Sequence, residues 1–110
     1  MKNEYLYNAL ITNVVDGDTV DARVDLGFSI YTEMRLRLYG IDTPELNSKI
    51  LDERLAAQDA KRFVETMCLN QTVLLRTYKK DKYGRYLADI IIGESTVNQM
   101  LLIEGLAKVY

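Results

Sequence analysis

Two runs in the first third of the chain alternate apolar and polar side chains, and this pattern constrains the fold more than any other feature. The first run covers residues 19–26, directly after the turn signal Asp16-Gly17-Asp18, and the second covers residues 31–39. A period of two is typical of strands that bury one face. Residues 5–15, rich in aromatic and branched side chains, precede the turn and form a hairpin with the first run. The chain therefore begins with three predicted strands.

The residues that follow change to a helical period. We expect a helix over residues 52–67, with acidic Asp52 and Glu53 near its start, where the helix dipole favours them. Residues 72–77 and 86–92 predict two further strands joined by a charged turn. A short helix follows Gly93 and ends at Gly105, and residues 107–110 are a candidate for a last short strand. The predicted apolar positions of the two helices are Ala56, Ala60, Phe63, Val64 and Met67 in the first and Val97, Leu101 and Leu102 in the second, with Ser95 or Thr96 as the cap of the second.

This order of elements predicts an α+β fold that is mainly β. Three strands, a helix, two strands and a helix fit a curled five-stranded sheet that closes around one core, as in the partly open Greek-key barrel of the OB-fold. The chain has 110 residues and no linker, repeat or shift in composition. We therefore expect residues 1–110 to form a single domain.

Composition excludes several kinds of site. The chain has no histidine and only one cysteine, Cys68, so it builds neither a Cys/His zinc site nor a histidine acid–base catalyst. The net charge of −2 means that a nucleic-acid partner must be attracted by a local basic cluster. No signal peptide and no membrane-spanning run are recognisable. We expect a cytoplasmic protein without a membrane partner, although a mature secreted chain would look the same.

Three polar clusters stand at the ends of predicted strands. They are residues 16–19, Arg37 with residues 42–45, and residues 81–85. Each cluster alone is ordinary turn chemistry. Together they supply hard oxygen ligands, which Ca²⁺ prefers, and two arginines, which suit the charge of a phosphodiester transition state.

These residues have chemically distinct assignments. Asp18, Asp42 and the backbone carbonyl of Thr43 are the candidate metal ligands. Glu45 is the candidate general base that activates a water molecule. Arg37 and Arg85 are the candidates that grip the phosphate oxygens. We consequently infer phosphate chemistry.

The same clusters resemble the staphylococcal nuclease-like (thermonuclease) family. The resemblance rests on four blocks in order, which cover nearly the whole chain: VDGDTV at residues 15–20, RLYGIDTPE at 37–45, DKYGR at 81–85 and GLAKV at 105–109. It implies an OB-type five-stranded barrel with helices and a Ca²⁺-dependent hydrolase that cuts DNA or RNA. It also implies the roles given above for Asp18, Arg37, Asp42, Thr43, Glu45 and Arg85, and contacts of Lys82 and Tyr83 with a further phosphate of the bound nucleotide.

A basic and aromatic segment adjoins the third block. Lys79, Lys80 and Lys82 are interleaved with Tyr78 and Tyr83. The segment is either a solvated loop or a lip on which nucleotides stack and phosphates track. We expect single-stranded DNA or RNA to be the preferred substrate.

The chain departs from the secreted members of the family after Tyr110, where those members continue into a C-terminal helix. Either the domain is a short form, or a second protomer covers the exposed surface as in a homodimer, or the chain is truncated. The alternative function is an OB-fold module that binds nucleic acid or protein without cutting it. Such modules usually lose the arginines and carboxylates that this chain keeps.

The remaining conspicuous residues have structural interpretations. We expect Asp16 and Asp21 to be turn and surface residues and Arg35 to be exposed. Tyr5 and Tyr7 are expected at the rim of the barrel. We expect Cys68 to be a small packing residue near the end of the first helix.

Overall fold

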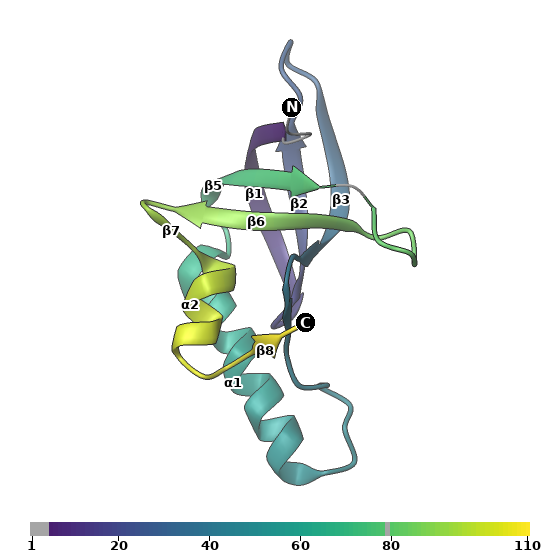
Figure 1. The fold of residues 1–110 in the computed structure, drawn as a ribbon. Coiled ribbons are helices and arrows are strands. Elements are labelled where there is room, and N and C mark those ends of the chain that lie inside the picture. Colours follow the sequence, from purple (N-terminus) through teal and green to yellow (C-terminus); the bar gives the residue numbers. More distant parts are fainter. Residues whose placement is uncertain (1–4, 79) are drawn as a thin grey trace.

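Five strands form a closed barrel in the computed structural model, which describes residues 5–78 and 80–110. Their order around the sheet is β3-β2-β1-β5-β6, and a further pairing of β3 with β6 closes the barrel. Both helices lie toward the same end of the barrel (Figure 1). This confirms the predicted α+β, OB-type barrel. The barrel strands are β1 (Tyr5–Asp16), β2 (Thr19–Asp25), β3 (Tyr31–Leu38), β5 (Thr72–Tyr78) and β6 (Tyr86–Ile92).

The closing pair is short and parallel. Leu36, Arg37 and Leu38 of β3 pair with Tyr86, Leu87 and Ala88 of β6, whereas the other barrel neighbours are antiparallel. The buried side chains Leu36, Leu38, Ala88 and Ile90 of these two strands face the core. Because successive strand residues point to opposite faces, Arg37 is directed away from that core.

The first helix, α1 (Leu51–Cys68), packs one face against the barrel. Ala60 and Val64 are buried as predicted, and Cys68 is fully buried, which confirms its packing role. The buried residue near the start is Ala57, whereas the predicted Ala56 is only half-buried. The difference amounts to a small rotation about the helix axis, because adjacent residues on a helix are about 100° apart.

The second helix, α2 (Val97–Ile103), begins at the cap Thr96, whose hydroxyl accepts a hydrogen bond from the Gln99 amide at 3.0 Å. Asn98, a polar residue that the apolar pattern did not predict to be inside, is buried. Its side-chain amide donates to the carbonyls of Tyr39 and Ala88, and its carbonyl accepts from the Ile90 amide. Asn98 therefore ties α2 to β6 and to the end of β3.

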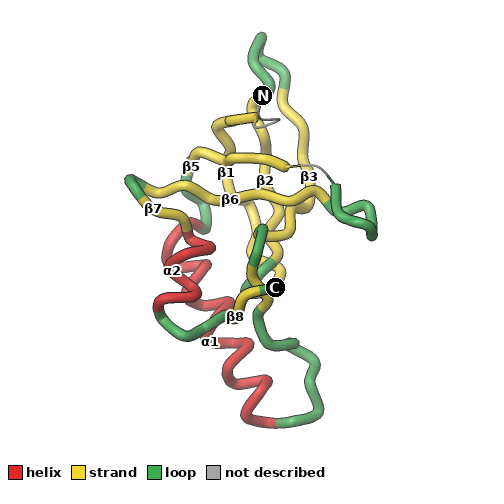
Figure 2. Tube along the Cα trace, viewed as in Figure 1, coloured by secondary structure: helices red, strands yellow, loops and turns green. Residues whose placement is uncertain are grey.

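Three two-residue strands complete the structure: β4 (Ile41–Asp42), β7 (Ser95–Thr96) and β8 (Lys108–Val109). β8 confirms the predicted last strand and pairs antiparallel with β4, while β7 pairs antiparallel with the end of β6. β4 and β7 were not predicted, because a two-residue run carries no readable period. Figure 2 shows β8 beside the loop that leads from β3 toward α1.

Other expectations about individual residues are confirmed. Tyr5 is 61% exposed, Tyr7 is half-buried, and their rings stack at the rim of the barrel. Arg35 is exposed and pairs with Asp21 at 2.8 Å. Among the described residues, no helix combines the length and the apolar character that a membrane crossing requires.

Candidate active site

The turn between β1 and β2 presents Asp18 to the rest of the site. The Asp18 amide donates to the carboxylate of Asp16 at 3.1 Å, which fixes the turn. Gly17, between them, is buried under α1: a Cβ atom placed on it would lie 2.7 Å from the Cβ atom of Ala60 and 2.9 Å from Cγ2 of Thr43. Only glycine fits this approach, so the DGD sequence places Asp18 against Thr43.

Asp18 uses both carboxylate oxygens within the protein. Oδ1 accepts from the Thr19 hydroxyl at 3.0 Å, and Oδ2 accepts from the Thr43 amide at 3.2 Å. Oδ2 also lies 3.6 Å from the guanidinium of Arg37. These contacts join the first predicted cluster to the second.

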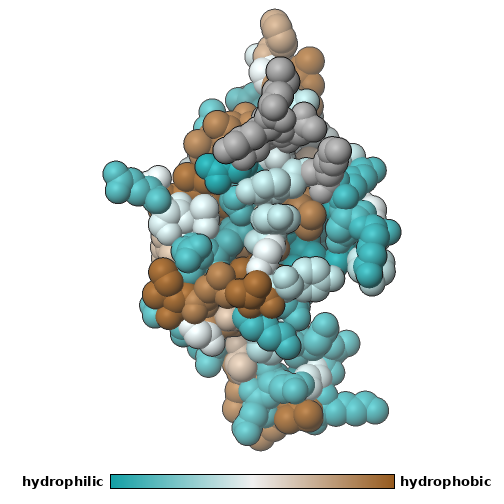
Figure 3. Space-filling model, in the orientation of Figure 1, coloured by the Kyte–Doolittle hydropathy of each residue, from teal (hydrophilic) through white to brown (hydrophobic). Residues whose placement is uncertain are grey.

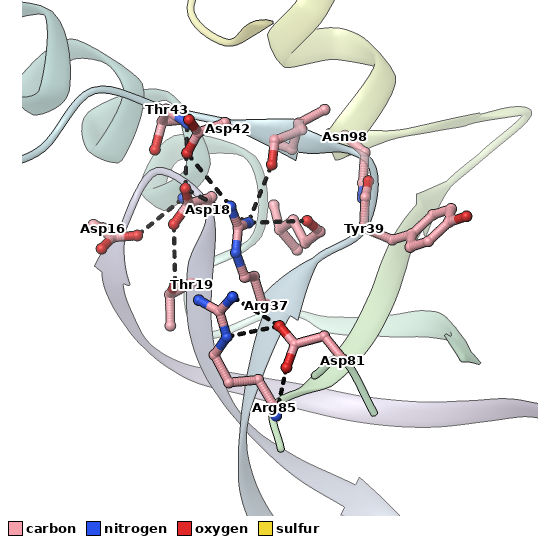
Figure 4. Close-up of polar contacts among 12 residues, drawn as sticks. Asp16, Asp18, Thr19, Arg37, Tyr39, Asp42, Thr43, Asp81, Arg85 and Asn98 are labelled. Carbon is pink, nitrogen blue, oxygen red and sulfur yellow. Dashed lines mark hydrogen bonds and ion pairs between the residues drawn. The ribbon is translucent and has the colours of Figure 1, made fainter. Parts of the chain in front are cut away.

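Arg37 is the centre of the site (Figure 4). Its side chain is 8% exposed and lies between Asp18 and Asp42, with an ion pair to Asp42 at 3.4 Å. It also donates to the backbone carbonyl of Ile41 at 3.1 Å, and the ring of Tyr110 lies 4.8 Å from its guanidinium carbon. A buried guanidinium is costly unless it is paired, and here two carboxylates and a carbonyl supply the pairing.

Burial and close contact shift the pKa values of the two aspartates of the turn in opposite directions. Burial, together with the hydrogen bond and the charge of Asp18, raises the pKa of Asp16 to about 6. Burial opposes ionisation of Asp18 as well, but hydrogen bonds from Asp16 and the Thr43 amide and the charge of Arg37 outweigh it, so the pKa of Asp18 is lowered. When the pair holds a single proton, as it does below about pH 6, the proton is therefore on Asp16 and the charge is on Asp18. Asp16 is a turn residue, as predicted, and also a direct partner of the site.

Glu45 lies next to this cluster on the wall of a cleft of about 400 Å³. Asp42 and Thr43 line the same cleft, and the residues around β8 form its opposite side. Glu45 itself is exposed. The cleft thus gives solvent and ligands access to one side of the candidate metal ligands.

Arg85 stands apart from these contacts. Asp81 holds its guanidinium at 2.7–2.8 Å and also accepts a hydrogen bond from its amide. Hydrogen bonds from Arg85 and the Tyr83 amide, working against burial, lower the pKa of Asp81. In the strand register Arg85 lies one residue before the closing pair, on the same face of β6 as Leu87, which pairs with Arg37.

Lys82 and Tyr83 lie on the exposed loop between β5 and β6. The Lys82 ammonium is 5.2 Å and the Arg85 guanidinium 5.1 Å from the ring of Tyr83. These three residues therefore form one basic and aromatic group. Of the predicted lip, Lys79 lies outside the described residues, and Tyr78 turns toward Asp89 and Tyr39 instead of the loop.

Side chains near Asp18 supply only some of the oxygen ligands that a hard cation needs. Within the described residues, no group of three or more His, Cys, Asp or Glu side chains is arranged to hold a metal. Two carboxylates, backbone carbonyls and water are nevertheless ligands that Ca²⁺ takes. The buried hydroxyl of Thr43, next to Asp42, has no hydrogen-bond partner among the described residues. The chemistry of these oxygens fits calcium.

Sequence reasoning missed three supporting residues of the site. Asp81 stands four residues before Arg85 within DKYGR, a spacing that suggests pairing. Asn98 and Tyr110 gave no such signal, because their contacts with the Tyr39 carbonyl and with Arg37 depend on how α2 and β8 pack.

Comparisons with known proteins give a consistent result. A family described as staphylococcal nuclease homologue matches residues 35–110. A thermonuclease of Staphylococcus hyicus is 34% identical over 108 residues, covering 96% of this chain, and one of Staphylococcus intermedius is 36% identical over 101 residues, covering 90%. An uncharacterized protein of Methanocaldococcus jannaschii is 35% identical over 128 residues, covering 94%. The chain spans 57–60% of the length of these three relatives.

Proposed function

The chain belongs to the family of staphylococcal nuclease homologues, and from that premise we propose that it is a Ca²⁺-dependent nuclease that hydrolyses phosphodiester bonds of DNA or RNA. The observation that carries the proposal is the cluster of Asp18, Arg37, Asp42 and Thr43, which come from the β1–β2 turn, strand β3 and the segment after it and contact one another beside an open cleft. The Arg37 guanidinium lies between the carboxylates of Asp18 and Asp42, near the unsatisfied hydroxyl of Thr43. The guanidinium suits a bound phosphate, and the oxygens suit a divalent cation.

Asp18, Asp42 and the Thr43 carbonyl would hold the calcium ion, which when bound supplies positive charge that stabilises the phosphate in the transition state. Against the effect of burial, the hydrogen bonds to Asp18 and the charge of Arg37 lower the pKa of Asp18 and so favour its ionised form. The turn is therefore ready to present an ionised ligand at neutral pH.

Arg37 binds the phosphate from the protein side of the site. A guanidinium has five N–H donors, and the contacts with Asp18, Asp42 and Ile41 involve its two terminal nitrogens. Those carboxylates fix the orientation of the fork before the substrate arrives. Preorganised charge of this kind acts on the transition state without a cost of reorganisation at the moment of reaction.

Glu45 takes the proton from the attacking water. Its place on the wall of the cleft, beside Asp42 and Thr43, supports this role because a water molecule in the cleft reaches both the carboxylate and the phosphate. Arg85 is the second phosphate ligand, and its side chain is 44% exposed, so it exchanges Asp81 for a phosphate oxygen without crossing the core.

The test compares cleavage of single-stranded and duplex DNA and of RNA in excess Ca²⁺ and in chelator. Cleavage only with Ca²⁺ is the expected result, and substrates that stay intact in both conditions would show that the protein is not a nuclease. Glu45→Gln should lower kcat by roughly 100-fold or more, the size of a general-base contribution. Glu94→Gln, an exposed carboxylate in the turn after β6, is the matched control and should cut normally.

The alternative is a barrel that binds nucleic acid or protein without cutting it. The observation that favours it is the enclosure of both arginines, Arg37 by Asp18 and Asp42 and Arg85 by Asp81. Binding of oligonucleotides that neither depends on Ca²⁺ nor leads to cleavage would select this alternative.

Self-association and cytoplasmic localisation stay predictions. Figure 3 shows apolar side chains gathered over α2 and β8, where Ile103 is 72% and Val109 is 76% exposed. Surfaces of this kind favour contact between copies. Sedimentation of the purified chain at several concentrations measures the oligomeric state.

A further inference from the structure

A second cleft, of about 310 Å³, opens at the end of the barrel farther from α1. The Asn70 amide, just after α1, donates to the Ile11 carbonyl in the middle of β1, and α1 extends away from the start of β1 (Figure 1). The cleft is lined by Tyr5 and Tyr7, at the start of β1. Four tyrosines from three strands form much of its wall, and aliphatic core residues form its floor. The tyrosines are Tyr5, Tyr7, Tyr78 and Tyr86, and the floor includes Leu36 and Leu75.

Two pairs of contacts hold these rings in place. The hydroxyl of Tyr78 donates to the carboxylate of Asp89 at 2.5 Å, and its ring stacks on Tyr39 with centroids 4.2 Å apart. The rings of Tyr5 and Tyr7 stack with centroids 6.5 Å apart. Aromatic rings fixed in this way lose little conformational entropy when a flat ligand packs on them.

Positive charge lies at the mouth of the cleft. The Lys80 ammonium is 4.6 Å from the ring of Tyr86, and Tyr86 directly follows Arg85, the proposed phosphate ligand. Leu36 and Arg37 form a second adjacent pair, in which the leucine lines the cleft and the arginine belongs to the candidate active site. The same two strands therefore carry the cleft on one face and the phosphate-binding residues on the other.

We propose that this cleft binds an unpaired base of a single-stranded nucleic acid, with Lys80 facing the adjoining phosphate. The proposal rests on the nuclease function proposed above and deepens it by naming a base-binding subsite outside the catalytic cluster. Tyrosine faces stack on any base, and a lysine beside them suits the backbone of the strand. An aliphatic side chain has neither the flat face that stacks on these rings nor the negative charge that the ammonium attracts.

The occupant must be unpaired for a physical reason. A base enters such a cleft only when it leaves its stack, and in a duplex this step costs a few kcal/mol, whereas a single strand offers the base freely. The cleft therefore confers a preference for single strands. A strand without a base at the matching position should lose that advantage.

The experiment measures binding of a fluorescent single-stranded oligonucleotide in chelator, so that the strand is not cut. Tyr86→Leu removes a ring that is 40% exposed and should weaken binding by about ten-fold, the usual size of one stacked base. Tyr86→Phe keeps the ring and should bind like the unchanged protein. Tyr31→Leu removes a ring that is 50% exposed and packs on Arg23 outside the cleft, and this variant should also bind normally.

Photocrosslinking locates the base directly. A strand that carries 5-iodouracil should crosslink to Tyr7 or Tyr86, and an abasic strand should bind the unchanged protein and Tyr86→Leu equally. Crosslinks confined to Tyr83, or equal affinity of Tyr86→Leu and the unchanged protein, would overturn the proposal. So would a Tyr86→Leu variant that binds strands normally but no longer associates with a second copy or a peptide.

Failure of the subsite and failure of the nuclease function are distinguishable. Absence of cleavage with loss of binding in Tyr86→Leu would leave the subsite standing without the enzyme. Normal Ca²⁺-dependent cleavage with unchanged binding and kcat/KM in Tyr86→Leu would leave the enzyme standing without the subsite.

Discussion

The contact between Gly17 and helix α1 predicts a large and specific effect of one methyl group. Gly17→Ala would place a Cβ atom 2.7 Å from the Cβ atom of Ala60, whereas carbon atoms in contact are usually about 3.5–4.0 Å apart. Helix α1 or the turn must therefore shift by roughly 1 Å. Overpacking of this kind costs about 1–3 kcal/mol, and each kcal/mol lowers the Tm of a domain of this size by about 5 °C.

A double-mutant cycle identifies the cause of the loss. Ala60→Gly removes the methyl group that collides and by itself costs about 1 kcal/mol, because glycine is a poor helix residue. If the collision is the reason, the double variant should be more stable than the sum of the two single effects predicts, by about 1 kcal/mol or more. Part of the loss should stay, since Cγ2 of Thr43 lies 2.9 Å from the same Cβ position.

Urea denaturation of the four proteins measures these differences. Gly93→Ala is the control, because its φ of +61° is strained for alanine but its Cβ would meet nothing within 4 Å. The loss of stability that Gly93→Ala causes should be the same with and without Ala60→Gly. Strictly additive effects of Gly17→Ala and Ala60→Gly would refute the collision, and a Gly17→Ala variant as stable as the parent would refute the close approach itself.

Three further predictions concern buried polar groups. Because the pKa of Asp16 is raised to about 6 from 3.8, the folded state binds an extra proton between these values, and its stability falls as the pH rises through about 6. Asp16→Asn should therefore increase the free energy of unfolding by about 1 kcal/mol at pH 8, after discounting for partial exposure, and by almost nothing at pH 3. Equal gains at both pH values in thermal denaturation would contradict this. Asn98→Ala leaves the Ile90 amide and the Tyr39 carbonyl without their partner and should cost about 2–4 kcal/mol in urea denaturation, whereas its exposed neighbour Gln99→Ala should cost little. Cys68 is buried and its thiol pKa is raised to about 11, so a thiol reagent at neutral pH should modify it at the rate of unfolding; rapid modification of the native protein would contradict its burial.

The sequence predicted the long elements because each contains several periods of its pattern. Strand β6 has the predicted bounds, β1, β2, β3 and β5 differ from the prediction by one residue at one end, and α1 is one residue longer at each end. The strands β4 and β7 were missed because two residues carry no period. The prediction that residues 1–110 form a single domain stays a prediction.

The site was predicted as a set of residue types, and the structure adds how they meet. Asp18, Arg37, Asp42 and Thr43 form one cluster, as their common chemistry suggested. The opposed pKa shifts of Asp16 and Asp18 and the ring of Tyr110 near Arg37 were not predictable, since both depend on distances that only the closed barrel sets. Their catalytic roles stay predictions.

The three-residue pairing between β3 and β6 has a kinetic consequence. It joins Leu36 to Tyr86 and closes the barrel between segments far apart in the chain, so chain entropy makes it a late step of folding. Arg37 sits within this seam and Arg85 directly before it. Amide hydrogens of the seam should therefore exchange with solvent before those of the β1–β2 hairpin, and each such opening separates the two arginines while most of the molecule stays folded. The free energy of opening the seam, and not the global stability, then sets the fraction of molecules that hold both arginines in place.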